Sequence, residues 1–111
     1  MEAEQAGEGR VEGRFFVKQD HQGPDGAAHG GVIAAALEEA MSLCLHAEGV
    51  PASTRRLEVE QFAPAPVGAF VRVEATITDR DERKVSLRAR AHAADSTMLA
   101  EAQAVFATEP G

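Results

Sequence analysis

Residues 32–45 read VIAAALEEAMSLCL, and this stretch decides the fold. It is rich in strong helix formers and contains neither glycine nor proline, whereas Gly49 and then Pro51 follow it as stop signals. The pattern predicts one helix of about 16 residues, or about 24 Å. Apolar residues occur on nearly every side of this helix, which is typical of a buried helix. Other parts of the chain must therefore wrap around it.

The rest of the chain has the features of strands, at residues 10–18, from 57–59 onward, and at 69–78, 85–92 and 98–106. Within the last three segments apolar and polar side chains alternate, and a period of two indicates an antiparallel sheet with one dry face. On the polar face, Glu74 is expected opposite Arg88 or Arg90. The predicted fold class is α+β, with a curved antiparallel sheet wrapped around one long central helix.

A chain of 111 residues is long enough for one domain. Residues 1–9 are rich in glutamate, glycine and alanine without periodicity, so we expect a disordered or frayed tail there. The single domain is expected to span residues 10–108.

The charge balance argues against two classes of partner. Eleven Lys and Arg residues stand against 18 Asp and Glu residues, a net charge of -7, whereas proteins that bind nucleic acids or membrane surfaces usually carry a basic patch. The apolar stretch contains Glu38 and Glu39 and looks too short to span a bilayer. The single cysteine, Cys44, fits a reducing compartment, and the acidic N-terminus does not resemble a signal peptide, so we expect a cytoplasmic protein.

The residues before and within the helix carry the chemistry. Residues 21–31 read HQGPDGAAHGG and run directly into the helix. Glycines at a helix N-terminus let a ligand approach backbone amides that have no partner within the helix, and these amides stabilise an oxyanion. Glu38 lies about two turns into the helix among alanines and leucines, where an unpaired carboxylate is costly. His21 and His29 lack further ligands at zinc spacing, so no metal is expected.

The pattern His29-Gly30-Gly31, six residues, then Glu38 resembles the signature of hotdog-fold acyl-CoA thioesterases, the superfamily of phenylacetyl-CoA and 4-hydroxybenzoyl-CoA thioesterases. Residues 57–62 (LEVEQF), 66–68 (PVG) and 100–102 (AEA) resemble later strands of the same family. The resemblance extends from about Gly13 to Thr108. It implies a hotdog fold and hydrolysis of an acyl-CoA to a free acid and CoA, without any cofactor.

The resemblance also implies roles for single residues. Gly30 supplies the oxyanion amide, His29 supports the thioester carbonyl, and Glu38 is the nucleophile or the general base. Ser42, one turn further, matches a residue that helps to hold the attacking water. Gln22 is the nearest candidate for an amide that relatives place before the two glycines.

Substrate contacts are expected from Gly31 and from Arg55 and Arg56, because an anionic ligand approaching an acidic protein needs a local basic patch. Arg80, Arg83 and Lys84 are further candidates to meet the CoA phosphates.

The family's site lies between subunits, which implies a homodimer, and often a dimer of dimers. His29 and Gly30 of one chain then meet Glu38 of the other. Two alternatives remain open: a non-catalytic module that binds acyl-CoA or acyl carriers, and a hydratase or dehydratase of the same fold. Glu39 is expected to face solvent, because adjacent helix positions diverge by about 100°.

Overall fold

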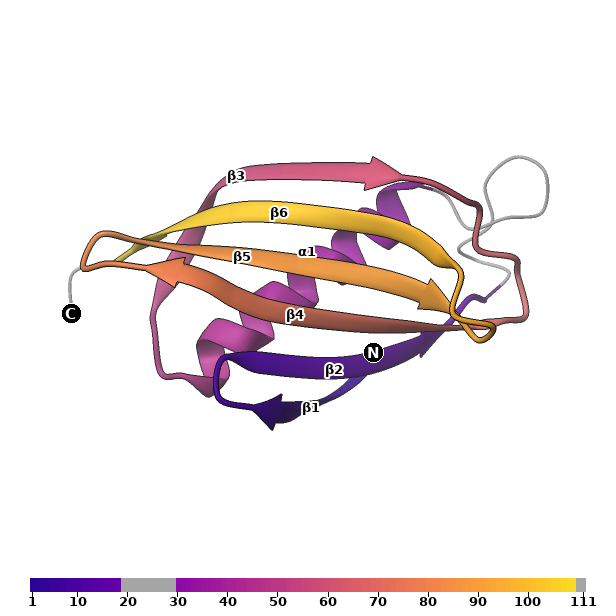
Figure 1. Ribbon diagram of the computed structural model, residues 1–111, viewed down its shortest axis with the longest axis horizontal. Helices are drawn as coiled ribbons and strands as arrows, with labels where there is room; N and C mark the ends of the chain where they lie inside the picture. Colours follow the sequence, from indigo (N-terminus) through magenta and orange to yellow (C-terminus); the bar gives the residue numbers. More distant parts are fainter. Residues whose placement is uncertain (19–29, 110–111) are drawn as a thin grey trace.

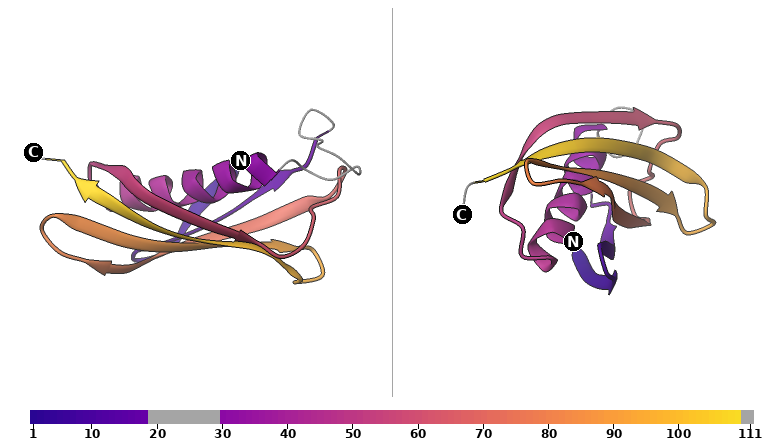
Figure 2. Two further views of the ribbon diagram at one scale, coloured as in Figure 1. Left: turned by 90° about the horizontal axis from the view of Figure 1, so that it is seen from above. Right: turned by 60° about the vertical axis from the view of Figure 1, so that its left-hand side comes forward.

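The computed structural model describes residues 1–18 and 30–109. Its elements are β1 (Glu2–Gly7), β2 (Arg10–Phe16), α1 (Gly30–Ala47), β3 (Ala52–Gln61), β4 (Phe70–Arg80), β5 (Lys84–Ala93) and β6 (Met98–Thr108). The strands form one antiparallel sheet in the order β1-β2-β4-β5-β6-β3, which leaves β1 and β3 at the edges. The sheet curves, and α1 lies along its concave side (Figures 1 and 2). The predicted α+β architecture is confirmed.

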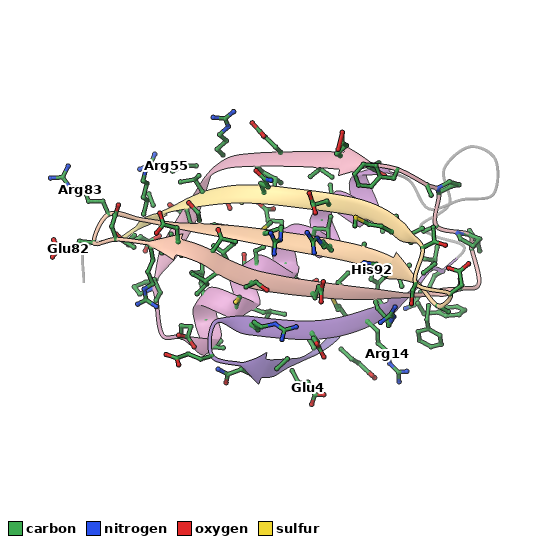
Figure 3. The ribbon with its side chains drawn as sticks, in the orientation of Figure 1. Glu4, Arg14, Arg55, Glu82, Arg83 and His92 are labelled. Carbon is green, nitrogen blue, oxygen red and sulfur yellow. The ribbon has the colours of Figure 1, made fainter. Side chains whose placement is uncertain are left out.

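The alternation along the strands divides the sheet into a dry inner face and a polar outer face. In β4, Val71, Val73 and Ala75 are buried, while the outer-face residues Arg72 and Glu74 reach solvent. Figure 3 shows the charged side chains projecting from the outer face. The core therefore lies between the inner face and the helix.

The helix is two residues longer than predicted, and it buries one side. Phe106, Leu37 and Met41 are among the largest fully buried side chains, and burial of each contributes about 1.5–3 kcal/mol. Length and hydropathy alone would allow this 18-residue helix to cross a membrane, contrary to the sequence expectation, but its apolar side packs into the core. The buried helix residues are Ile33, Ala36, Leu37, Ala40, Met41, Cys44 and Leu45.

The sheet covers one side of the helix, as predicted, and the opposite side reaches solvent. Gly31, Ala35, Glu39, Ser42 and His46 recur every three or four residues along the opposite side, and all five are exposed. A single curved sheet covers only the side of a helix that it faces. The exposed position of Glu39 agrees with the sequence prediction.

Gly49 ends the helix as predicted. Its φ of 69° lies in the left-handed region, which glycine adopts without a steric penalty. The N–H of Val50 donates to the Leu45 carbonyl at 3.0 Å, and the N–H of Gly49 donates to the His46 carbonyl at 3.0 Å. These two bonds form a Schellman motif, which satisfies the last carbonyls of the helix.

The polar face has the predicted register but different ion pairs. Glu74 lies directly opposite Arg90, as expected. The Glu74 carboxylate, however, pairs with Arg10 of β2 at 3.8 Å, and Arg90 pairs with Glu101 of β6 at 2.7 Å. Glu74 and Arg90 therefore each have charged neighbours on two strands. The alternation along one pair of strands does not show which neighbour forms the ion pair.

The prediction of a frayed tail at residues 1–9 is wrong. Residues 2–7 form β1, which pairs with β2 along its length. Gly7 and Gly9 form the connecting turn with φ values of 138° and 70°, and glycine is the residue best suited to this backbone. The sequence lacks apolar alternation here, so its strand signal is weak.

Contacts with the end of the helix anchor this turn. The Glu48 carboxylate accepts hydrogen bonds from the Gly9 N–H at 3.4 Å and from the Gln5 amide at 3.5 Å. Glu48 also pairs with Arg80 at 3.8 Å. The Cys44 thiol, which is buried, donates to the Gly9 carbonyl at 3.1 Å. The N-terminal hairpin is thus part of the folded domain.

Cys44 yields a prediction for the pH dependence of stability. Burial raises the pKa of its thiol, the charge of Glu48 adds to the rise, and the Ile77 N–H opposes it. An unfolded cysteine has a pKa of about 8.5. Between about pH 8.5 and the raised folded pKa, only the unfolded chain releases the thiol proton. The contribution of Cys44 to stability is therefore complete below about pH 8.5 and is lost as pH rises through the folded pKa. Thermal unfolding between about pH 7 and pH 10 should show a steeper alkaline fall in Tm for the natural chain than for Cys44→Ala. Parallel curves would contradict this.

Candidate functional site

The N-terminus of α1 is held by the end of β3. Gly30 is the first helical residue, and the Gln61 side-chain amide donates to its carbonyl at 3.1 Å. A Cβ at residue 30 would stand 2.7 Å from Gln61 Nε2, closer than such atoms approach. A side chain at position 30 would therefore displace the end of Gln61 from this hydrogen bond.

Glu38 lies two turns along the same helix, also beside β3. Its side chain is half-buried, and the Thr54 hydroxyl donates to Glu38 Oε2 at 3.0 Å. This bond offsets part of the cost of removing a carboxylate from water. It fixes one oxygen and leaves Oε1 for other chemistry.

Gly30 and Glu38 are too far apart in one chain to act on the same carbonyl. Eight residues of helix separate them by about 12 Å. A reacting carbon must lie roughly 3–3.5 Å from the attacking atom and its oxygen within hydrogen-bond distance of the stabilising amide. Within one chain, Gly30 and Glu38 therefore lie at two separate places.

Two more of the predicted residues, Ser42 and Gly31, lie on the same helix. Ser42 is exposed one turn beyond Glu38, and the hydroxyl hydrogen-bonded to Glu38 belongs to Thr54 instead. Gly31 is exposed at the start of the helix. Gln22 and His29 lie outside the described residues.

The two arginines of β3 differ in their contacts. Arg56 forms an ion pair with Glu58 on the outer face. Arg55 is exposed and projects from the same end of the sheet as Arg83 (Figure 3). Basic side chains therefore lie at the end of β3 that carries Thr54.

The sequence pattern did not single out Thr54 or Gln61 as site residues. Strict alternation places Thr54 on the polar face with the other even-numbered residues of β3. A β-bulge between Thr54 and Arg56 inserts Arg55, so that Thr54 lies opposite the buried Phe106 and faces the helix. Alternation with Leu57 and Val59 does put Gln61 on the inner face, but no local signal shows that the helix begins beside it.

Other parts of the described chain offer weaker candidates. A shallow groove of about 530 Å³ lies on the outer face, across β1, β2, β4 and β5, and its lining includes Arg14, Arg72 and His92. Glu2, Glu4, Glu12 and Glu74 line the same groove, which leaves no net positive charge. Within residues 1–18 and 30–109, no group of three His, Cys, Asp or Glu side chains is placed to hold a metal ion.

Comparison with solved structures shows the same fold. A thioesterase superfamily protein is 24% identical with a TM-score of 0.88, and the match covers 94% of this chain but 54% of that one, so this chain spans about half its length. A Streptococcus mutans protein bound to acetyl CoA is 15% identical with a TM-score of 0.92, with coverage of 97% and 87%. A mutant of the phenylacetic acid degradation protein PaaI from Thermus thermophilus is 22% identical with a TM-score of 0.86, with coverage of 96% and 92%.

The predicted hotdog fold is thus confirmed. No curated protein matches the sequence. A family model described as the thioesterase superfamily matches residues 25–100, which is more than half of the chain. This chain belongs to the thioesterase superfamily.

Proposed function

We propose that this protein hydrolyses an acyl-CoA thioester to a free acid and CoA. The observation that carries the proposal is the Glu38 carboxylate, held by the Thr54 hydroxyl at 3.0 Å on a helix that begins with Gly30. The acetyl CoA bound to the Streptococcus mutans relative supports CoA thioesters as the substrate class. A module that only binds its ligand has no use for a half-buried carboxylate beside a thioester.

Each group of the proposed site has a chemical role. Thr54 fixes Glu38 Oε2, so Oε1 either attacks the thioester carbon or takes a proton from the attacking water. The Gly30 amide and the positive end of the helix stabilise the developing oxyanion. Ser42 helps to hold the water, and His29 supports the carbonyl. When the oxyanion collapses, the C–S bond breaks, and the departing CoA sulfur takes up the proton that Glu38 received from the water. If Glu38 attacks directly, CoA leaves first and is protonated by solvent, and water then hydrolyses the acyl anhydride on Glu38 to release the free acid.

Two copies of the chain are needed to bring these groups together. β3 is an edge strand whose backbone is paired on one side, with β6. Antiparallel pairing of two β3 strands about a two-fold axis continues the sheet and forms a homodimer. If the strands overlap fully, Ala52 lies opposite Gln61 of the partner subunit, and Thr54 lies about 7 Å from that point.

This pairing completes the site twice. Thr54 holds Glu38 in one chain, and Gln61 of the partner subunit holds the start of the partner's helix beside it. The separation of about 12 Å within one chain thereby becomes a short distance between chains. Arg55 and Arg56 lie next to Thr54, where they can meet the CoA phosphates. Two such dimers are expected to assemble into a tetramer.

The first test replaces the acid. Glu38→Gln keeps the shape and can still accept the Thr54 hydrogen bond, but it removes the charge and the base. In assays of an acyl-CoA panel with a thiol-detecting dye, we expect kcat to fall by at least about 10²-fold while affinity stays within a few-fold. Glu39→Gln is the matched control, and its exposed side chain predicts little change. Equal losses from the two substitutions, or none from Glu38→Gln, would show that the acid is wrongly assigned.

The second test examines the orientation of that acid. Thr54→Val removes the hydroxyl at nearly constant volume, which frees the Glu38 carboxylate to rotate. We expect kcat to fall by about tenfold or more, and Thr54→Ser to retain most of the activity because it keeps a donor. Activity of the valine variant equal to that of the serine variant would contradict the role of the hydroxyl.

The third test asks whether the site is shared. Glu38→Gln inactivates one half of the proposed site, and Gly30→Val inactivates the other half. A heterodimer of the two variants therefore keeps one intact site. Refolding them together should restore about a quarter of the natural activity per chain, because half of the dimers are mixed and each has one good site of two. Each variant refolded alone is the control. If the mixture is no more active than the controls, each chain holds its own site.

A further inference from the structure

Gln61 links the last position of β3 to the first position of α1. Two side-chain hydrogen bonds join these elements, one from Thr54 to Glu38 and one from Gln61 to Gly30. Both bonds end on residues to which the proposed function gives a chemical role. Gln61 itself is exposed, and it contributes little to the core.

The chemistry of the contact favours an amide at this position. The Gly30 carbonyl accepts from Gln61 Nε2 at 3.1 Å, so position 61 must present a donor. Glutamate at this place would set a carboxylate against a carbonyl oxygen and near the oxyanion. Leucine would fill a similar space but could not donate a hydrogen bond to the Gly30 carbonyl.

The contact is also steric. Gln61 Nε2 lies 2.7 Å from the place of a Cβ at residue 30, and Gln61 Cδ and Oε1 lie 3.4 Å from it. A Cβ at residue 30 would therefore push the Gln61 amide, the flexible end of an exposed side chain, away from the Gly30 carbonyl. Gly30 and Gln61 form a matched pair, in which the absence of one side chain makes room for the other.

We propose that Gln61 is a positioning residue for the oxyanion-binding turn. It holds the first peptide of α1 through the Gly30 carbonyl and thereby sets the direction of the amides that face the substrate. This inference rests on the proposed thioesterase function. Gln61 does not contact the reacting atoms in this role, and its effect passes through Gly30.

The first experiment compares Gln61→Leu with Gln103→Leu, the same change at an exposed strand glutamine on the outer face of β6. Misplacement of a catalytic group by about 1 Å costs up to about 10²-fold. We expect Gln61→Leu to lower kcat by about 10- to 100-fold with KM nearly unchanged, and Gln103→Leu to leave both unchanged. A rise in KM without a fall in kcat, or no difference between the two variants, overturns the proposal.

The second experiment tests the matched pair by a double-mutant cycle of Gly30→Ala, Gln61→Ala and both together. Gly30→Ala forces the Gln61 amide aside, whereas Gln61→Ala removes the obstacle. Because either change alone already breaks the hydrogen bond between Gln61 and Gly30, we expect the double variant to lose little more activity than the single variants, which is non-additive behaviour. Independent, multiplying losses overturn the proposal.

The same cycle separates this inference from the proposed function. If the natural chain hydrolyses no acyl-CoA in the panel, the proposed function fails, and with it the catalytic role of Gln61. The denaturant midpoints of the four chains still report the contact. Non-additive midpoints then support the Gly30–Gln61 pair as a structural contact, and additive midpoints overturn it.

Discussion

Alanine lines much of the inner face of the sheet, and this sets how closely α1 approaches it. The buried alanines of the central strands are Ala75, Ala89, Ala91, Ala100, Ala102 and Ala104. Their short side chains leave room for Leu37, Met41 and Leu45 of the helix, which fill the concavity of the curved sheet. A tightly packed helix cannot slide or rotate without opening voids. The places of Gly30 and Glu38 relative to β3 follow from this packing.

The site therefore combines a rigid apolar base with a few polar contacts near the sheet edge. The core fixes the helix axis, while Thr54 and Gln61 hold Glu38 and Gly30 on it by hydrogen bonds. In the proposed site, exposed residues therefore matter, although exposure usually marks tolerance to substitution. Their contribution to overall stability is small, because solvent-exposed hydrogen bonds add little to it. Their contribution lies in geometry.

Much of the fold could be predicted from local periodicity, because the helix and the central strands have clear periods. β1 could not be predicted in this way. It is held in place by pairing with β2 and by contacts of its turn with Glu48 and Cys44, which are distant in sequence. The roles proposed for Gly30 and Glu38 came from family resemblance rather than from spacing. Thr54 stayed hidden because a bulge reverses the alternation, and Gln61 because its value depends on a helix end that only the fold brings near.

The two edges of the sheet differ in a way that bears on solubility. Between residues 2 and 8 the β1 edge carries three glutamates and no basic residue. Two such edges repel each other, and like charges at a strand border are a common defence against runaway strand addition. The β3 edge carries both signs, with Arg55, Arg56, Glu58 and Glu60. In the proposed homodimer, pairing of the two β3 edges would leave only the acidic β1 edges unpaired, and their like charges disfavour further strand addition.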